Sequence, residues 1–273
     1  MGTGCRRAIL FLLFSPLFGT GFAQTETPVK VDKPLKSYSH WYFGAEYGVP
    51  FLFGDFTSFS ADKTYVGSQF GGFAGYQVNS WIGIEASART GYTRMGAKSY
   101  AGDYLMNADG MTYYTNQDFN TWKYKEVFSK VHFTNIGLQM NLNVNNFFGP
   151  NRGNRRWTVL LSPAVYAQHF STELINKADK SPLSGKKTDK WNIGIGGDVS
   201  LRYKISRAFD VQLRTGIIWV NNNKMDGIST LIKSKDHFMT SAGLSLIWKV
   251  GKKKEDNVLY ASRRAADVEI RYI

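Results

Sequence analysis

The chain has 273 residues, a formal net charge of +13 and one cysteine, so a small scaffold held by several disulfides is excluded. An aromatic content of 15% together with 27 glycines is typical of a β-rich protein with many turns rather than of a helical one. The basic balance indicates acidic partners.

The N-terminus has the pattern of an export signal. Arg6 and Arg7 precede an apolar run, and Gly21 and Ala23 provide the small residues of a cleavage site. We therefore expect a secretory signal peptide over residues 1–23, cleaved after Ala23, followed by a periplasmic N-terminal segment over 24–39. The apolar run is too short to act as a membrane anchor, and no later stretch is apolar enough for a membrane helix.

Eight long strands are predicted in the remainder. Each is about 11–16 residues, against about 5–6 for an ordinary strand, and is long enough to cross a bilayer at a tilt. The predicted strands cover residues 40–51, 68–78, 81–94, 132–145, 156–169, 190–205, 207–220 and 237–250.

The predicted strands alternate between apolar and polar residues at most positions. Over 134–144, Ile136, Leu138 and Met140 share one parity, while the intervening positions hold asparagine, glutamine and glycine. In a soluble sandwich or lipocalin-like barrel the polar parity would face water. In a membrane barrel the apolar parity faces lipid instead.

The lengths of the connections favour the membrane arrangement. Short turns are predicted at 79–80 and 206 and a modest one at 146–155, whereas the others are long: 52–67, 95–131, 170–189 and 221–236. Short periplasmic turns and long extracellular loops are typical of outer-membrane barrels. The predicted fold is an all-β, eight-stranded antiparallel up-and-down transmembrane barrel over 40–250, in the outer membrane of a Gram-negative bacterium.

Tryptophan falls near the predicted strand ends, as in the aromatic girdles of membrane barrels. The girdle is predicted to consist of Trp41, Trp81, Trp157 and Trp248 at the periplasmic ends and Trp191 and Trp219 at the extracellular ends.

The inward parity is rich in charge. Eight strands leave room only for side chains, so we expect a closed lumen whose charges pair with one another. A hairpin turning at Ser206 would place Arg202 opposite Asp210 and Asp198 opposite Arg214. A narrow gated pore for small ions or solutes is the alternative reading of the same residues. The predicted network comprises Glu46, Glu85, Arg89, Asp198, Arg202, Asp210 and Arg214.

Two segments carry a family resemblance. "WIGIEASARTGYTRMGAKS" and "TNIGLQMNLNVNNFFG…RRWTVLLSPAVYAQ" resemble the outer-membrane β-barrel domain, or PorT-like porin family, of Bacteroidetes-type bacteria. Gly137 stands where that family has a proline, and Ser162-Pro163 replaces Gly-Pro. The resemblance implies an eight-stranded outer-membrane barrel and no single activity.

A second resemblance raises an enzymatic alternative. "HFTNIG", residues 132–137, is similar to the His-x-Ser-Asn-x-Gly segment of outer-membrane lipid A deacylases. In a lipid A-modifying hydrolase, His132 would be the base and Thr134 would replace the serine nucleophile. If Leu142 stands opposite Val159, His132 also faces His169, a pair that could bind a metal. Alternatively, His132 is a structural histidine at the membrane interface. We predict no enzyme, metal or cofactor.

The loop 95–131 is rich in aromatic residues that suit either a binding surface or packing within the loop. The candidate surface residues are Tyr104, Tyr113, Tyr114, Trp122 and Tyr124. Lysines in 170–189 and 221–236 could contact lipopolysaccharide phosphates. The expected partners are outer-membrane lipid and lipopolysaccharide, the barrel assembly machinery during insertion, and an envelope or extracellular protein; no nucleic acid is expected.

The segment 251–273 is predicted to be a loosely ordered periplasmic tail, although "VEIRYI" could instead form a final strand or pair with a partner. Together these features predict an integral outer-membrane barrel with a structural or surface-interaction role.

Overall fold

A computed structural model of the chain describes residues 38–54, 56–98, 122–148, 155–183, 188–221, 225–227, 237–251 and 256–261. The expected signal peptide, its cleavage point and most of the segment 24–39 lie outside these ranges. No helix in the described residues is long and apolar enough to cross a membrane.

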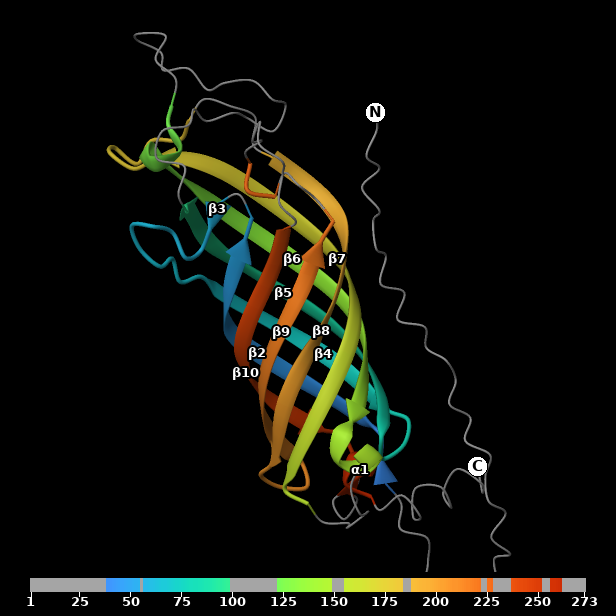
Figure 1. The fold of residues 1–273 in the computed structure, drawn as a ribbon. Coiled ribbons are helices and arrows are strands. Elements are labelled where there is room, and N and C mark those ends of the chain that lie inside the picture. Colours follow the sequence, from blue (N-terminus) through green and yellow to red (C-terminus); the bar gives the residue numbers. More distant parts are fainter. Residues whose placement is uncertain are drawn as a thin grey trace, which may run out of the picture. The chain divides into compact units, whose positions relative to one another are not determined.

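Eight long strands form one antiparallel sheet that closes on itself (Figure 1). Each strand pairs with the next along the chain, and β10 pairs back with β2, so Gly243 stands opposite Gly48 at the closure. The strands are β2 (Trp41–Phe53), β4 (Ser68–Gln77), β5 (Ile82–Ala97), β6 (Val127–Asn143), β7 (Trp157–Asn176), β8 (Thr188–Lys204), β9 (Phe209–Val220) and β10 (His237–Lys249).

The remaining elements are short and lie at the two ends of the barrel. At the end with the long connections, β3 (Phe56–Thr57) bridges β2 and β5, and a 3₁₀ turn covers Tyr124–Glu126. At the end with the short turns, α1 (Val144–Phe148) follows β6. There β1 (Tyr38–Ser39) pairs in parallel with β11 (Asp256–Asn257), which leads into the 3₁₀ turn Val258–Tyr260.

The predicted up-and-down barrel of eight strands is confirmed, and three strands extend at least three residues further into the loops than predicted. β5 reaches Ala97, β6 begins at Val127, and β7 continues to Asn176, so the connection 95–131 is partly strand. The physical reason is an apolar core inside the barrel at the loop end. Thirteen buried side chains form it, and they come from β2, β3, β5, β6, β7, β9 and β10, from Tyr124 and from Met225.

The barrel is apolar outside and polar inside. On β6, Ile136 and Leu138 are half exposed (50% and 55%), whereas the alternating Asn135, Gln139 and Asn141 are buried. On β8, Ile193 and Ile195 are still more exposed, at 73% and 68%. Because a soluble protein would reverse this arrangement, the fold is that of a membrane-spanning barrel.

Candidate functional site

The middle of the barrel interior holds a network of buried charges. Arg89 contacts Glu46 at 3.2 Å through Nε and Asp198 at 3.0 Å through Nη2. Arg214 reaches Glu46 at 3.4 Å through Nη1 and Glu85 at 2.8 Å through Nη2, with Asp198 at 3.9 Å from Nε. Each arginine therefore joins carboxylates from different strands across the lumen.

Neutral polar groups complete the coordination of Glu85. Its Oε2 accepts hydrogen bonds from the Tyr42 hydroxyl (2.9 Å) and from Asn141 Nδ2 (3.1 Å), and its Oε1 accepts one from Gln139 Nε2 (2.9 Å). Because a buried charge is tolerated only when its lone pairs are satisfied, this shell explains how a fully buried carboxylate is held in the lumen.

A third arginine balances the three carboxylates of the network. The Arg202 guanidinium lies 4.8 Å from the centre of the Tyr42 ring, and its Nε donates to Gln212 Oε1 at 2.8 Å. The guanidinium of Arg214 lies similarly, 4.7 Å from the Phe73 ring centre. Such cation–π contacts stabilise a desolvated cation without a full ion pair.

The cross-strand pairs expected around Ser206 are wrong by two residues. The structure places Arg202 opposite Gln212 and Asp198 opposite Gly216. The Ser206 hydroxyl accepts hydrogen bonds from the amides of Ala208 and Phe209, which lengthens the turn. The inward parity is unchanged, because a one-residue shift of the turn centre moves each partner by two positions.

Asp210 belongs instead to a second charged cluster at the short-turn end. It pairs with Lys249 of β10 inside the barrel and accepts a hydrogen bond from the Tyr260 hydroxyl at 2.8 Å. Lys204 Nζ lies 2.5 Å from Asp256 Oδ2, and both lysines lie about the Tyr260 ring, at 4.7 and 4.8 Å from its centre. This cluster ties residues 256–261 to the strands.

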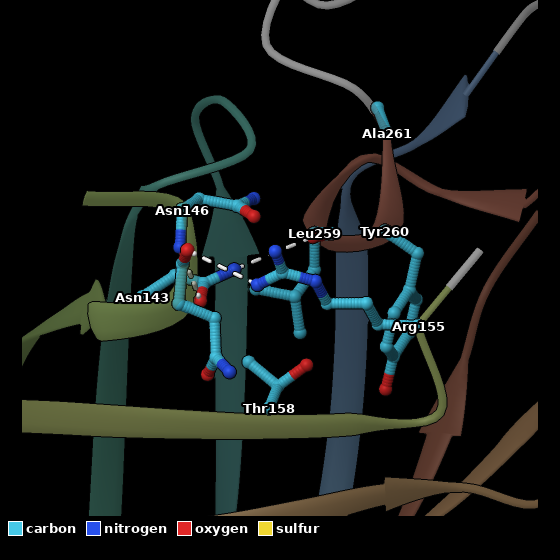
Figure 2. Close-up of a pocket in the computed structure, with 8 residues that line it drawn as sticks. Asn143, Asn146, Arg155, Thr158, Leu259, Tyr260 and Ala261 are labelled. Atoms are coloured by element: carbon cyan, nitrogen blue, oxygen red, sulfur yellow. Dashed lines mark hydrogen bonds between the residues drawn. The ribbon is translucent and has the colours of Figure 1, made fainter. Parts of the chain in front are cut away.

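Residues 256–261, which we term the terminal cap, close this end of the lumen. Leu259 and Tyr260 are buried against Leu160 of β7, and Asn257 Oδ1 accepts from the Leu259 amide at 3.0 Å. Figure 2 shows the segment carrying Leu259, Tyr260 and Ala261 beside Asn143, Asn146, Arg155 and Thr158, which line a small polar pocket with it. The expectation of a loosely ordered tail is therefore wrong for 256–261, whereas 262–273 lie outside the described residues.

The environment of Tyr260 makes its hydroxyl a very weak acid. Burial, followed by the charge of Asp210, raises the pKa of this phenol well above its usual range. The neutral hydroxyl is thus the form that the cap uses to donate to Asp210.

The opposite mouth of the barrel is also closed. Residues 225–227 enter it from the loop between β9 and β10, where Thr172 donates to the Met225 carbonyl (2.6 Å) and Ser129 to the Asp226 carbonyl (2.9 Å). Asp226 Oδ2 accepts from the Phe56 amide at 3.1 Å and lies 3.2 Å from His237 Nε2. Together with the apolar core, these contacts close the loop end.

The six predicted girdle tryptophans lie on the outside of the barrel or at its edge. Trp81 is half-buried, and the other five are more than half exposed. Trp41 packs edge-on against Tyr76, and Trp157 lies 4.5 Å from Tyr203, ring centre to ring centre. Aromatic pairs on the outer wall are consistent with a girdle, which stays a prediction until its depth in a bilayer is measured.

The residues of the enzymatic alternative do not assemble as expected. His132 is exposed opposite Tyr92 and Ser171, so it does not face His169. Thr134 shares a hydrogen bond with Thr90 at 3.1 Å. His169, which stands opposite Thr134, pairs with Asp189. No cluster of three potential metal ligands occurs in the part of the chain that the structure describes.

The aromatic loop residues divide into two groups. Tyr124 is buried at 2% exposure in the apolar core, with its ring edge-on to Phe56, so its proposed role on the surface is wrong. Trp122 packs against the same core and is only partly buried. Tyr104, Tyr113 and Tyr114 lie outside the described residues.

Comparisons with known proteins find similar solved structures but no family. No family model matches the chain, so the PorT-like resemblance is not confirmed, and no curated protein matches it. Neisserial surface protein A is 12% identical over 77% of this chain and 97% of its own, with a TM-score of 0.43. Ail of Yersinia pestis, in complex with the heparin analogue sucrose octasulfate, is 9% identical over 78% and 100%, again at 0.43. A major outer membrane protein from Thermus thermophilus is 12% identical over 77% and 99%, also at 0.43.

Proposed function

We propose that the protein is a closed outer-membrane barrel with a structural or surface-interaction role rather than a transport channel. The observation that carries this proposal is the filling of the lumen at three levels: the apolar core at the loop end, the arginine–carboxylate network in the middle and the terminal cap at the turn end. Exposed apolar side chains on every long strand support insertion in a bilayer, with the long loops outside the cell.

Conductance in planar bilayers tests the closed lumen. We expect no stepwise currents from the full chain, and none from a chain truncated after residue 255, because the central network still fills the barrel without the cap. Steady currents from the full chain would contradict the proposal.

The second candidate is a gated pore, and the terminal cap is the observation that favours it. Apart from the packing of Leu259 and Tyr260 on Leu160, the cap is held to the strands by a few polar groups, chiefly the Tyr260 hydroxyl and the Asp256 carboxylate. If the cap is the gate, the truncated chain conducts while the full chain does not. The same pair of proteins therefore separates the two functions.

Protease treatment of intact cells tests the surface role. Cleavage confined to 95–131, 170–189 or 221–236, together with a gel mobility that changes on boiling, is the expected result. Release of the chain with the soluble periplasmic fraction would contradict both the barrel insertion and the role. We also propose that the chain belongs to the PorT-like family and that its signal peptide is cleaved after Ala23.

A further inference from the structure

The outer faces of β5 and β6 carry two cations directly opposite each other. Arg94 and Lys130 are cross-strand partners, and both belong to the parity that points away from the lumen. Like charges in this position destabilise a sheet unless a counter-charge is supplied. Arg94 is exposed, and its guanidinium lies 5.8 Å from the centre of the Phe128 ring.

The nearby acids do not neutralise this pair. Glu173 stands opposite Lys130 on β7, yet among the described residues neither Arg94 nor Lys130 has an ion pair within 4.0 Å. Asp62 is engaged by Lys177, whose hydrogen bond lowers the pKa of that carboxyl below its usual range. In the lumen, by contrast, Arg89 and Arg214 each form ion pairs with carboxylates.

Two stacked aromatic rings and a further lysine extend the basic surface. Tyr65 stacks on Phe128 with ring centres 6.1 Å apart, and Lys63 Nζ lies 5.0 Å from the Tyr65 ring centre. Gly96 allows this approach, because a Cβ there would lie 2.9 Å from Tyr65 Cε2. Counting Lys63, Arg94, Lys130 and Lys177 against Asp62 and Glu173 leaves four positive and two negative charges, a net of +2.

The pair sits at the level where lipid headgroups are expected. Twelve residues separate Leu142, at the turn end of β6, from Lys130. At about 3.3 Å per residue and a tilt of about 40°, this corresponds to roughly 30 Å of height, just beyond an apolar band about 25 Å tall. The outward residues agree: Ile136, Leu138 and Met140 are apolar, and Thr134 and His132 come between them and Lys130.

We propose that Arg94 and Lys130 form a site on the outer wall that binds the phosphate of a lipid headgroup in the leaflet around the loop end. Guanidinium and ammonium groups suit phosphate oxygens, and basic side chains at this depth reach toward the headgroup layer. This site rests on the proposed function, in which that leaflet is the outer one. There the ligand is the phosphate of lipid A.

Binding of lipid A to the full chain in phosphatidylcholine nanodiscs tests the site, with diphosphoryl lipid A as the probe. The site variant is the double substitution Arg94→Ala and Lys130→Ala. Its matched control is Arg156→Ala with Arg207→Ala, which removes two exposed cations at the turn end. We expect the dissociation constant to rise about tenfold in the site variant and less than twofold in the control.

Two further probes identify the chemistry. Dephosphorylated lipid A is expected to bind the unaltered protein no more tightly than diphosphoryl lipid A binds the site variant, and inorganic phosphate is expected not to compete. The proposal would be overturned if both double variants lost the same affinity for diphosphoryl lipid A. It would also be overturned if dephosphorylated lipid A bound the unaltered protein as tightly as diphosphoryl lipid A, or if inorganic phosphate competed for the site.

Heat-modifiable mobility of each variant shows that the barrel is folded, and Lys130→Gln replaces the double variant if that protein does not fold. Failure of the unaltered chain to insert into the nanodiscs would contradict the proposed function itself, which separates the two failures.

Discussion

Replacing Arg214 by methionine removes the cation that joins the largest number of carboxylates. Arg214 contacts Glu46, Glu85 and Asp198, and its side chain is 3% exposed. The change leaves these three carboxylates with only Arg89 and Arg202. Because breaking a buried ion pair from one side strands an uncompensated charge, we expect the free energy of unfolding to fall by about 3–5 kcal/mol.

Urea-induced unfolding in lipid vesicles, followed by gel mobility, measures this loss. Arg207→Met, at an exposed turn position, is the control and should change the unfolding free energy by less than about 0.5 kcal/mol. In the double variant Arg214→Met with Glu85→Gln the charges balance again. We therefore expect the two changes to be non-additive by at least about 1 kcal/mol. If Arg214→Met alone lowered the free energy of unfolding by less than about 1 kcal/mol, the interior would not be one in which charges are buried and paired.

Further predictions address the wall, the cap and the enzymatic alternative. Gly216→Ala should destabilise the barrel in the same urea assay, because its Cβ would lie 1.8 Å from Asp198 Oδ1 and displace that carboxylate from Arg89. Leu138→Arg on the outer wall should cost about 2–4 kcal/mol in vesicles; an unchanged midpoint would mean that Leu138 does not meet lipid. Since the folded pKa of Tyr260 is raised, the contribution of its neutral hydroxyl to docking of the cap should be fully present below pH about 10 and be lost only as the pH rises toward that raised value. Tyrosinate absorbance up to pH about 11 should therefore be unaltered by Tyr260→Phe, and loss of one titrating tyrosine would contradict the buried phenol. His132→Ala should leave the mass spectrum of lipid A unchanged; loss of a modification would establish the enzyme instead.

The sequence predicts the wall of the barrel well, because residues that face the lumen and residues that face lipid alternate along every strand. The charged positions of the central network, from Glu46 to Arg214, lie inside as their parity indicates. Parity does not set register, however, so the partners of Arg202 and His132 depend on turn geometry. The Ser206 hydroxyl determines the first of these turns, and α1 follows β6 at the second, where Asn145 Oδ1 accepts from the Val159 amide at 2.6 Å.

The terminal cap and the core at the loop end could not be read from the pattern. The cap depends on contacts between residues far apart in the chain, such as Tyr260 with Asp210 and Asp256 with Lys204. Its strand β11 has only two residues, too few for periodicity to reveal. The core position of Tyr124 could not be predicted for a similar reason. In a loop, no periodic pattern distinguishes an aromatic residue of the core from one of the surface.

Thiol accessibility in vesicles tests the central claim most directly. Cys5 is the only cysteine, so a chain beginning at residue 24 carries only the thiol that is introduced. Three variants receive a small charged thiol reagent: Leu138→Cys on the wall, Ser200→Cys inside and Lys63→Cys in an exposed loop. We predict modification of the loop thiol alone, and of all three after denaturation. Modification at Leu138→Cys would show that the outer wall meets water, and modification at Ser200→Cys would show an open lumen; either result would contradict a sealed membrane barrel.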